Sequence, residues 1–168
     1  VFGPGRNFPL AILDQAEKRR SGEVEGALKV VDDQQGSPTF AADLAFALLA
    51  IARQDRENWG GGLLHLRNSG ETNWFAFARE ILDQAGFTDV AIDPVSSSTF
   101  ETAAKRPVFS VLDCSWEESK GIALPSWQDA LSRYLAGPDC PYELAVPLED
   151  PKSRAEVDVA IPTSEVPR

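Results

Sequence analysis

The sequence contains no methionine, one histidine and two cysteines, and each scarcity excludes a class of site. Cys114 and Cys140 stand in no Cys-x-x-Cys spacing, so the sequence predicts neither a disulfide framework nor a zinc site. His65 lies in the apolar run Leu-Leu-His-Leu with no catalytic constellation around it, which favours a structural role. We therefore expect no metal centre, and the unpaired cysteines favour a cytoplasmic location.

Positive charge and long apolar runs are also scarce. The 16 lysines and arginines are outnumbered by 26 acidic residues, which gives a formal net charge of −10. Nucleic acid is bound by clustered lysines and arginines, so no nucleic acid polymer is expected as a partner. One or two arginines can still hold a small diphosphate. The longest nearly apolar stretch, residues 40–52, contains Asp43 and is too short to span a bilayer, so no membrane partner is expected.

A dinucleotide-binding turn is missing as well. Such a turn needs a strand, a Gly-x-Gly-x-x-Gly sequence and a helix whose N-terminus faces the pyrophosphate. Gly3 and Gly5 lack the third glycine, and the glycines at 60–62 precede an apolar run instead of following one. The sequence also begins without a methionine or a basic leader, which favours a truncated start over a signal peptide.

What is present predicts one small α/β body over residues 1–137, with about four helices and three or four short strands. Helices are expected over residues 8–20, from Thr39 to 52, over 74–85 and over 126–136. Strands are expected at Leu28–Val31, Leu63–Leu66 and Val90–Val95, with a short extended piece near 109–112. Asn7, Thr39 and Ser126 are the expected N-caps, and Ser69 to Thr72 cap the third helix.

Three local patterns give further expectations. The helix after Thr39 carries apolar residues at helical spacing, so that face should be buried. Its members are Ala41, Leu44, Ala45, Leu48, Ile51 and Ala52. Trp74 and Trp127 stand at core spacing and should pack inside. Asp32 and Asp33 lie in a turn, where local backbone bonding explains an aspartate better than a metal does.

The segment 138–168 differs from the body. It contains six prolines, and its seven acidic and three basic residues give it a net charge of −4. We expect an acidic, proline-rich tail that is extended or disordered.

Several segments together carry a resemblance to a known family. They occupy residues 2–8, 30–44, 70–78, 105–113 and 121–127. In this order they resemble the substrate-binding half of the dTDP-4-dehydrorhamnose reductases, which belong to the extended short-chain dehydrogenase/reductase superfamily. The chain departs from the family at two places. The family often has a proline-containing dipeptide where this chain has Thr102 to Ala104, and commonly an asparagine where this chain has Phe109.

The resemblance implies an α/β fold. It also implies that the chain is the C-terminal substrate-binding portion of an NAD(P)-binding Rossmann-like extended short-chain dehydrogenase/reductase, whose N-terminal portion is missing. That enzyme would reduce dTDP-4-dehydro-L-rhamnose to dTDP-L-rhamnose with NADPH or NADH, bound mainly by the missing portion. Short-chain dehydrogenases use a tyrosine followed four positions later by a lysine. Neither Tyr134 nor Tyr142 has a lysine at that spacing. We therefore predict no catalytic residue in this chain and no activity for the chain alone.

The resemblance also suggests which residues line the cleft. Contacts to the nucleotide sugar are expected from Asn7, Phe8, Gln34, Ser37, Thr39 and Arg106, and contacts to the cofactor from Phe2, Gly3 and Pro4. Among these, Arg106 is the expected ligand of the diphosphate, because a planar guanidinium can bind two oxygens at once.

Alternatives stay open. Another extended short-chain dehydrogenase, such as a sugar-nucleotide epimerase, would share the architecture. A non-catalytic relative resembling the regulatory beta subunit of methionine adenosyltransferase would use the fold as a binding module. A gene fragment without independent activity is the third alternative, and whether the protein forms a homodimer is also open.

Overall fold

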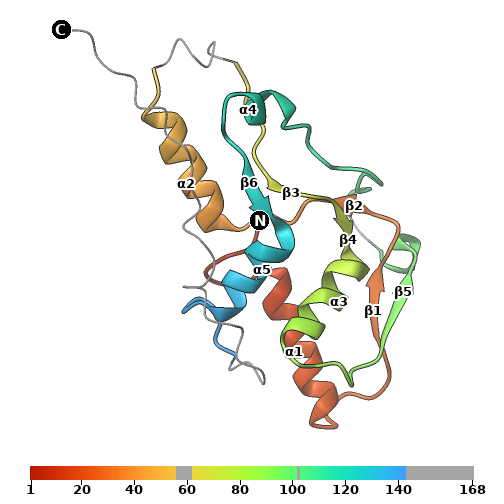
Figure 1. Cartoon of the computed structure of the whole chain (residues 1–168). Coiled ribbons are helices and arrows are strands. Elements are labelled where there is room, and N and C mark those ends of the chain that lie inside the picture. The colour runs from red at the N-terminus through yellow and green to blue at the C-terminus, as the bar shows by residue number, and fades with distance from the viewer. Residues whose placement is uncertain (56–61, 102, 143–168) are drawn as a thin grey trace, which may run out of the picture.

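The computed structural model describes residues 1–55, 62–101 and 103–142. The helices are α1 (Phe8–Arg20), α2 (Ala41–Ala52), α3 (Trp74–Gln84), α4 (Ser115–Ser119), α5 (Trp127–Ala136) and the 3-10 helix η2 (Ser97–Thr99). The strands are β1 (Leu28–Val31), β2 (Gln35–Gly36), β3 (Asn68–Ser69), β4 (Thr72–Asn73), β5 (Ile92–Val95) and β6 (Leu124–Ser126). The four predicted long helices are confirmed, and α4 is an element that the sequence pattern did not predict (Figure 1).

Helices α1, α3 and α5 gather at one end of the molecule, and α3 also packs on the parallel pair of β1 and β5 (Figure 1). Their shared core, here called the three-helix cluster, contains the fully buried Leu13, Ile81, Leu131 and Tyr134. Burying such side chains stabilises a fold by roughly 1.5–3 kcal/mol each. This half of the chain therefore has a core of its own.

The helix starts follow side-chain capping in three cases. Asn7 Oδ1 accepts the Leu10 N–H at 3.0 Å, and Ser126 Oγ accepts the Asp129 N–H at 3.2 Å, as predicted. The prediction that Ser69 to Thr72 cap α3 is wrong, because the cap is Asn73, whose Oδ1 accepts the Ala76 N–H at 2.7 Å. The prediction that Thr39 caps α2 is wrong: the helix begins at Ala41, and its N-cap residue is Phe40, whose side chain makes no capping hydrogen bond.

The described strands form three two-stranded sheets, namely β1 with β5, β2 with β4, and β3 with β6. The predicted strand at Leu63–Leu66 is wrong in this structure. Within the described residues, 62–67 pair with no strand, and pairing begins only at Asn68. The His65 N–H donates instead to a side chain, Glu117 Oε1, at 2.7 Å. An apolar run whose backbone stays unpaired lacks the neighbouring strand that its sequence is suited to.

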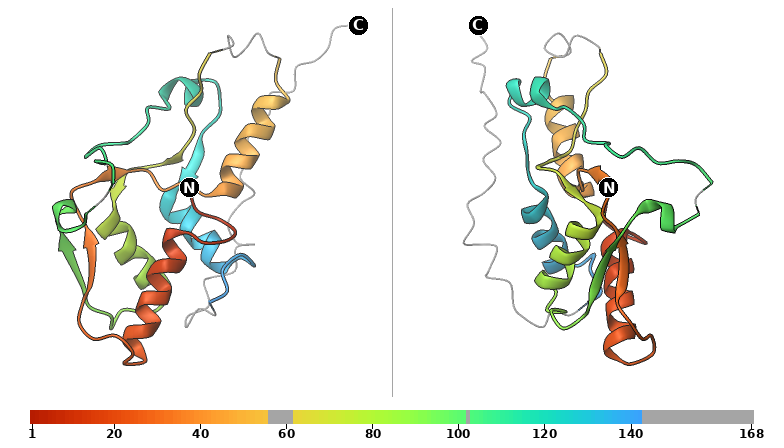
Figure 2. Two further views of the ribbon diagram at one scale, coloured as in Figure 1. Left: turned by 180° about the vertical axis from the view of Figure 1, so that it is seen from behind. Right: turned by 90° about the vertical axis from the view of Figure 1, so that its right-hand side faces the viewer.

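Helix α2 stands at the other end, away from α1 and α3, and its main contact is with β6 (Figures 1 and 2). Its buried residues are Asp43 and Ala47. The expectation of a buried apolar face is wrong, because Ala45, Leu48 and Ala52 are exposed and the other three predicted members are only half-buried. Phe46, Leu48 and Leu49 keep 69%, 53% and 53% of their surface exposed. The physical reason is that no second layer of the described chain lies against this helix.

A second, smaller group of buried side chains lies beneath α2. This α2 cluster contains Ala47, Ile122 and Leu124, with Leu64 and Leu66 only partly buried against it. Leu63 next to them is 85% exposed.

The first residues of the expected tail pack on the body. Cys140 is buried in the three-helix cluster, and the Tyr142 hydroxyl donates a hydrogen bond to the Asp14 carboxylate. The remainder of the predicted tail, 143–168, lies outside the described residues, so its extended or disordered state stays a prediction. Among the described helices, none is long and apolar enough to cross a membrane.

Candidate functional site

A pocket of about 290 Å³ opens where three segments meet. Its walls are the loop 34–38, the start of α3 at 72–74 with Phe77, and the loop at 106–110. The pocket brings Arg106 together with Gln34 and Ser37, which lie about 70 positions earlier in the sequence, and all three are residues that we expected to contact substrate.

Two of these side chains are available to a ligand. Within the described residues Arg106 makes no hydrogen bond or ion pair, and the Gln34 amide is equally unengaged. Ser37 is already committed, because its hydroxyl donates to the Gly70 carbonyl at 3.0 Å. Ser37 can therefore accept a hydrogen bond from a ligand but has no proton left to donate.

The loop that carries Arg106 is fastened to the opposite wall. The Gln35 N–H donates to the Val108 carbonyl at 2.7 Å, and the Ser110 N–H and hydroxyl both donate to the Gln35 carbonyl at 2.9 Å. Gly36 faces this contact, since a Cβ there would lie 3.2 Å from Ser110 Oγ. These bonds hold Arg106 at the rim of the pocket.

Three other predicted substrate residues lie outside the pocket lining. Thr39 is buried, and its hydroxyl donates to the Ser37 carbonyl at 3.2 Å. The Asn7 amide donates to the Gly3 carbonyl at 2.5 Å and to the Tyr134 hydroxyl at 2.8 Å, besides capping α1. Phe8 packs behind the pocket, with its ring stacked on Phe77 at 5.6 Å. Thr39 and Phe8 thus contact residues of the walls, whereas Asn7 fixes the start of α1.

The residues predicted to contact the cofactor do not fit a dinucleotide by themselves. Phe2 is 3% exposed, its N–H donates to the Thr39 carbonyl and its carbonyl accepts from the Ala41 N–H, each at 2.8 Å. A Cβ at Gly3 would lie 2.8 Å from the Ala41 Cβ, so this glycine is required by close packing on α2. Pro4 is exposed and has no backbone donor.

Trp74 is the pocket residue whose position the sequence analysis misjudged. It was expected in the core, as was Trp127, which is buried with 6% exposure. Trp74 instead keeps 36% of its surface exposed and lines the pocket. The local sequence does not separate the two tryptophans, because each is the first residue of its helix, directly after the N-cap Asn73 or Ser126.

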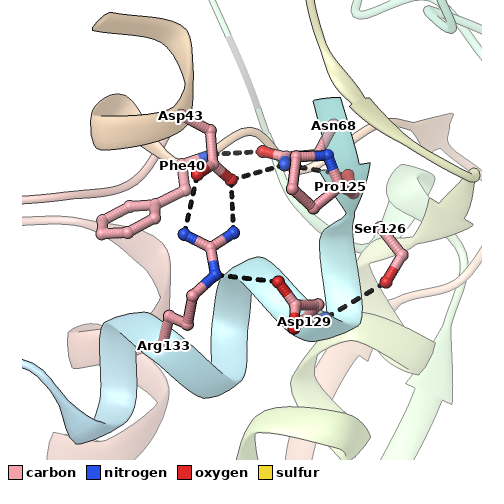
Figure 3. A network of polar contacts seen from close by, with 7 residues as sticks. All are labelled: Phe40, Asp43, Asn68, Pro125, Ser126, Asp129 and Arg133. Atoms are coloured by element: carbon pink, nitrogen blue, oxygen red, sulfur yellow. Dashed lines mark hydrogen bonds and ion pairs between the residues drawn. The ribbon is translucent and has the colours of Figure 1, made fainter. Parts of the chain in front are cut away.

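Behind the pocket loop lies a buried polar network (Figure 3). Its centre is Asn68, which is fully buried. Asn68 Oδ1 accepts the Phe40 N–H at 2.8 Å, and Asn68 Nδ2 donates to Asp43 Oδ2 at 2.7 Å and to the Pro125 carbonyl at 3.0 Å. One side chain thus joins the end of the loop 34–40, the start of α2 and β6.

Arg133 completes the network from α5 (Figure 3). Its guanidinium donates two hydrogen bonds to the Asp43 carboxylate, both at 2.7 Å, and a third to Asp129 at 2.8 Å. The hydrogen bond to Asp43 is the main reason why the pKa of Arg133 is raised above its ordinary value. Because Ser37 and Phe40 are both bonded to the short segment 68–70, the network fixes the pocket loop at two points.

Asp33 is held mainly by the distant segment 96–97 and not by its own turn, so the expectation of local backbone bonding is wrong. Its carboxylate accepts hydrogen bonds from the Ser97 N–H and from the hydroxyls of Ser96 and Ser97, at 2.9–3.1 Å. The Ser97 N–H is the largest cause of the lowered pKa of Asp33. Across the described residues, no group of three or more His, Cys, Asp or Glu side chains could hold a metal ion.

Known proteins resemble this chain along most of its length. Residues 1–139 match the family described as RmlD substrate binding domain. The dTDP-4-dehydrorhamnose reductases of Mycobacterium tuberculosis and Sinorhizobium fredii are 37% and 33% identical, over 81% and 78% of this chain. The matches cover 42% and 45% of those two relatives, so the chain spans less than half the length of the curated relatives it matches.

Solved structures agree with the sequence match. The reductase of Clostridium acetobutylicum superposes with a TM-score of 0.68 at 31% identity, covering 80% of this chain and 44% of that one. The reductase of Bacillus anthracis, solved in complex with NADP, gives a TM-score of 0.66 at 30% identity, with 78% and 42% covered. The α/β fold predicted from the resemblance is therefore confirmed, and the chain belongs to the RmlD substrate-binding domain family.

Proposed function

We propose that this chain forms the nucleotide-sugar side of the cleft in an NAD(P)H-dependent reductase that converts dTDP-4-dehydro-L-rhamnose to dTDP-L-rhamnose. The observation that carries the proposal is the pocket that joins Gln34, Ser37 and Arg106 in a chain of this family. The reductases of M. tuberculosis and S. fredii, named for this substrate, support it.

Each pocket residue has a role that its free atoms allow. The guanidinium of Arg106, unpaired within the described residues, suits the two charged oxygens of a diphosphate. The Gln34 amide offers one acceptor and two donors, and Ser37 Oγ offers an acceptor to a ligand hydroxyl or N–H. These contacts bind and orient the substrate.

The chemistry requires parts that the described residues do not contain. A bound nicotinamide would supply hydride to the C4 keto carbon, and a tyrosine with its lysine would supply the proton. Since Phe2, Gly3 and Pro4 offer no dinucleotide site by themselves, we assign the cofactor, and with it the proton donor, to a portion of the enzyme outside this chain. We further infer action in the cytoplasm, which the two free cysteines support.

A second candidate keeps the dTDP group and changes the sugar. A relative from Streptomyces antibioticus, 30% identical over 128 residues, is named a probable dTDP-4,6-dihydroxy-2-methyloxan-3-one 4-ketoreductase. A pocket that binds the nucleotide would serve either sugar, so the two candidates share Arg106 and differ in the product formed.

The test is a chimera in which this chain replaces the matched 42% of the M. tuberculosis reductase. We expect NADPH oxidation with dTDP-4-dehydro-L-rhamnose and formation of dTDP-L-rhamnose, while the 168-residue chain alone shows none. The controls are the intact M. tuberculosis enzyme and the same chimera with its catalytic tyrosine replaced by phenylalanine.

Two results would contradict the proposal. A folded chimera that binds NADPH but reduces no dTDP-4-keto sugar would exclude a reductase role for this chain. Turnover by the isolated chain that is sensitive to mutation of its own residues would show that a complete active site lies within it.

A further inference from the structure

We propose that Trp74 is the stacking platform for the pyrimidine base of the nucleotide, and so a determinant of nucleotide binding at this pocket. The inference rests on the proposed function, because it names the part of the nucleotide sugar that the pocket holds.

Trp74 has the geometry of a fixed aromatic surface. Its ring lies 4.7 Å from the ring of Phe8 at an angle of 57°, and Phe8 is stacked on the buried Phe77 at 5.6 Å and 18°. Trp74 thus packs on Phe8, which is itself held by Phe77, while 36% of the Trp74 surface stays exposed and the residue lines the pocket. A ring that is already immobilised loses little conformational entropy when a ligand stacks on it.

The groups around Trp74 suit a base better than a sugar. A flat aromatic face attracts another planar ring, and stacking of a base on an aromatic side chain is worth a 5- to 150-fold gain in affinity, as an order of magnitude. The Gln34 amide, free within the described residues, carries both a donor and an acceptor and can pair with the carbonyl and N–H edge of a pyrimidine. Arg106 at the rim is then left for the diphosphate.

The size and position of the pocket also favour binding of the base. At about 290 Å³ it lies at the low end of small-molecule sites, about 300–1,000 Å³, so it holds part of a nucleotide sugar. The reacting carbonyl must meet a hydride donor, and the described residues provide no site for one. A pocket built wholly from this chain is therefore suited to the non-reacting end of the substrate, the nucleoside.

The test uses the 168-residue chain and dTDP as the probe, with affinity measured by calorimetry and the base observed by proton NMR. In the parent we expect the thymine ring and methyl protons to shift upfield under the ring current of Trp74. Trp74→Leu should bind dTDP about 5- to 150-fold more weakly and abolish that shift. Trp74→Phe should retain most of the affinity and a smaller shift.

The matched control is Trp116→Leu, because Trp116 is 44% exposed and does not line the pocket. That variant should bind dTDP as the parent does. If the parent binds dTDP but Trp74→Leu binds equally well and keeps the upfield shift, the stacking role is overturned while the proposed function stands. If the parent binds neither dTDP nor inorganic pyrophosphate, the proposed function itself fails. Folding of each variant is confirmed by its amide NMR spectrum.

Discussion

The three-helix cluster and the α2 cluster differ in how much of their apolar surface the described chain covers. Around the first, α1, α3, α5 and the pair of β1 and β5 enclose Ile81 and Leu131 completely. Around the second, α2 has buried contacts on one side only, and Leu48, Leu49 and Leu63 keep more than half of their surface exposed. The described chain encloses the first region on all sides, so it is a complete core, whereas it covers the second region on one side only.

The difference bears on how the chain works. An exposed apolar patch on a soluble protein marks a surface that another body covers. Under the proposed function, that body is the cofactor-binding portion of the reductase, which would supply the layer missing from α2 and the strand missing beside residues 62–67. The Arg133–Asp43 ion pair joins the two regions, because it links α5 to the start of α2.

The largest effect expected in the isolated chain comes from a leucine in the complete core. Leu131 is fully buried, so Leu131→Ala should lower the free energy of unfolding by about 2–5 kcal/mol. Leu49→Ala on α2 is the matched control, and its cost should stay within about 0.5 kcal/mol because the side chain is 53% exposed. Urea denaturation measures both. Equal losses would mean that the two regions are equally packed.

The next effect concerns the ion pair between the regions. Arg133→Met leaves the Asp43 carboxylate, only 6% exposed, without its charged partner. We expect the free energy of unfolding to fall by about 3 kcal/mol. This is the lower end of the range for breaking a buried pair, because the Arg133 side chain is 32% exposed. Arg79→Met is the control: Arg79 is also 32% exposed and pairs with Asp83 on one helix, a contact worth about 0.3–0.5 kcal/mol. A loss no larger than that of the control would show that the network contributes little.

A third prediction separates binding from folding. Arg106 belongs to neither cluster, so in the chimera Arg106→Ala should leave the unfolding midpoint unchanged and raise the KM for the nucleotide sugar. The expected loss of substrate-binding free energy is about 1.5–3 kcal/mol, the usual contribution of hydrogen bonds to a charged group. Arg106→Lys should recover part of it, since a point charge lacks the bidentate fork. The exposed Arg6→Ala is the control, and an unchanged KM for Arg106→Ala would remove Arg106 from the site.

The smallest effect concerns Tyr142, which fastens the chain beyond α5 to α1. Burial is the largest cause that raises the pKa of Tyr142 to about 12, with the Asp14 hydrogen bond next. A raised pKa favours the neutral phenol in the folded state, so its stabilising effect is full below about pH 10 and is lost as the pH rises through about 12. Ultraviolet absorbance of tyrosinate should show this late ionisation, and Tyr142→Phe should remove the part that Tyr142 contributes, leaving that of Tyr134, whose pKa burial also raises. Ionisation near pH 10 in the folded chain would contradict the packing of residues 138–142.

Local signals in the sequence were sufficient to predict the helices whose caps and packing partners lie within the described chain. Asn7 and Ser126 cap α1 and α5, and the apolar spacing of Phe77 and Ile81 predicted the buried face of α3. The same spacing failed for α2, because periodicity shows that a face is apolar but not whether a neighbour is present to cover it. For the same reason Leu63–Leu66 has the composition of a strand and no partner within the described residues.

The pocket was only partly predictable. The resemblance singled out Gln34, Ser37 and Arg106, which the fold brings together. It could not show that the Ser37 hydroxyl is used by Gly70, nor that Thr39 is buried, because these depend on how the loop meets the segment 68–70. The spacing predicts Trp74 in the core as it does Trp127, and since both residues open a helix directly after its N-cap, only the tertiary packing distinguishes them.

Hydrogen exchange of the backbone amides tests most directly whether α2 and residues 63–66 form a surface made to be covered. In the isolated chain at low concentration, amides of α3 and α5 should exchange slowly, and those of 63–66 quickly except for the His65 N–H, which is bonded to the buried Glu117. In the chimera with the M. tuberculosis reductase, 63–66 and the α2 amides should become as protected as those of α3. Strong protection of 63–66 in the monomeric isolated chain, or unchanged rapid exchange in an active chimera, would contradict the account.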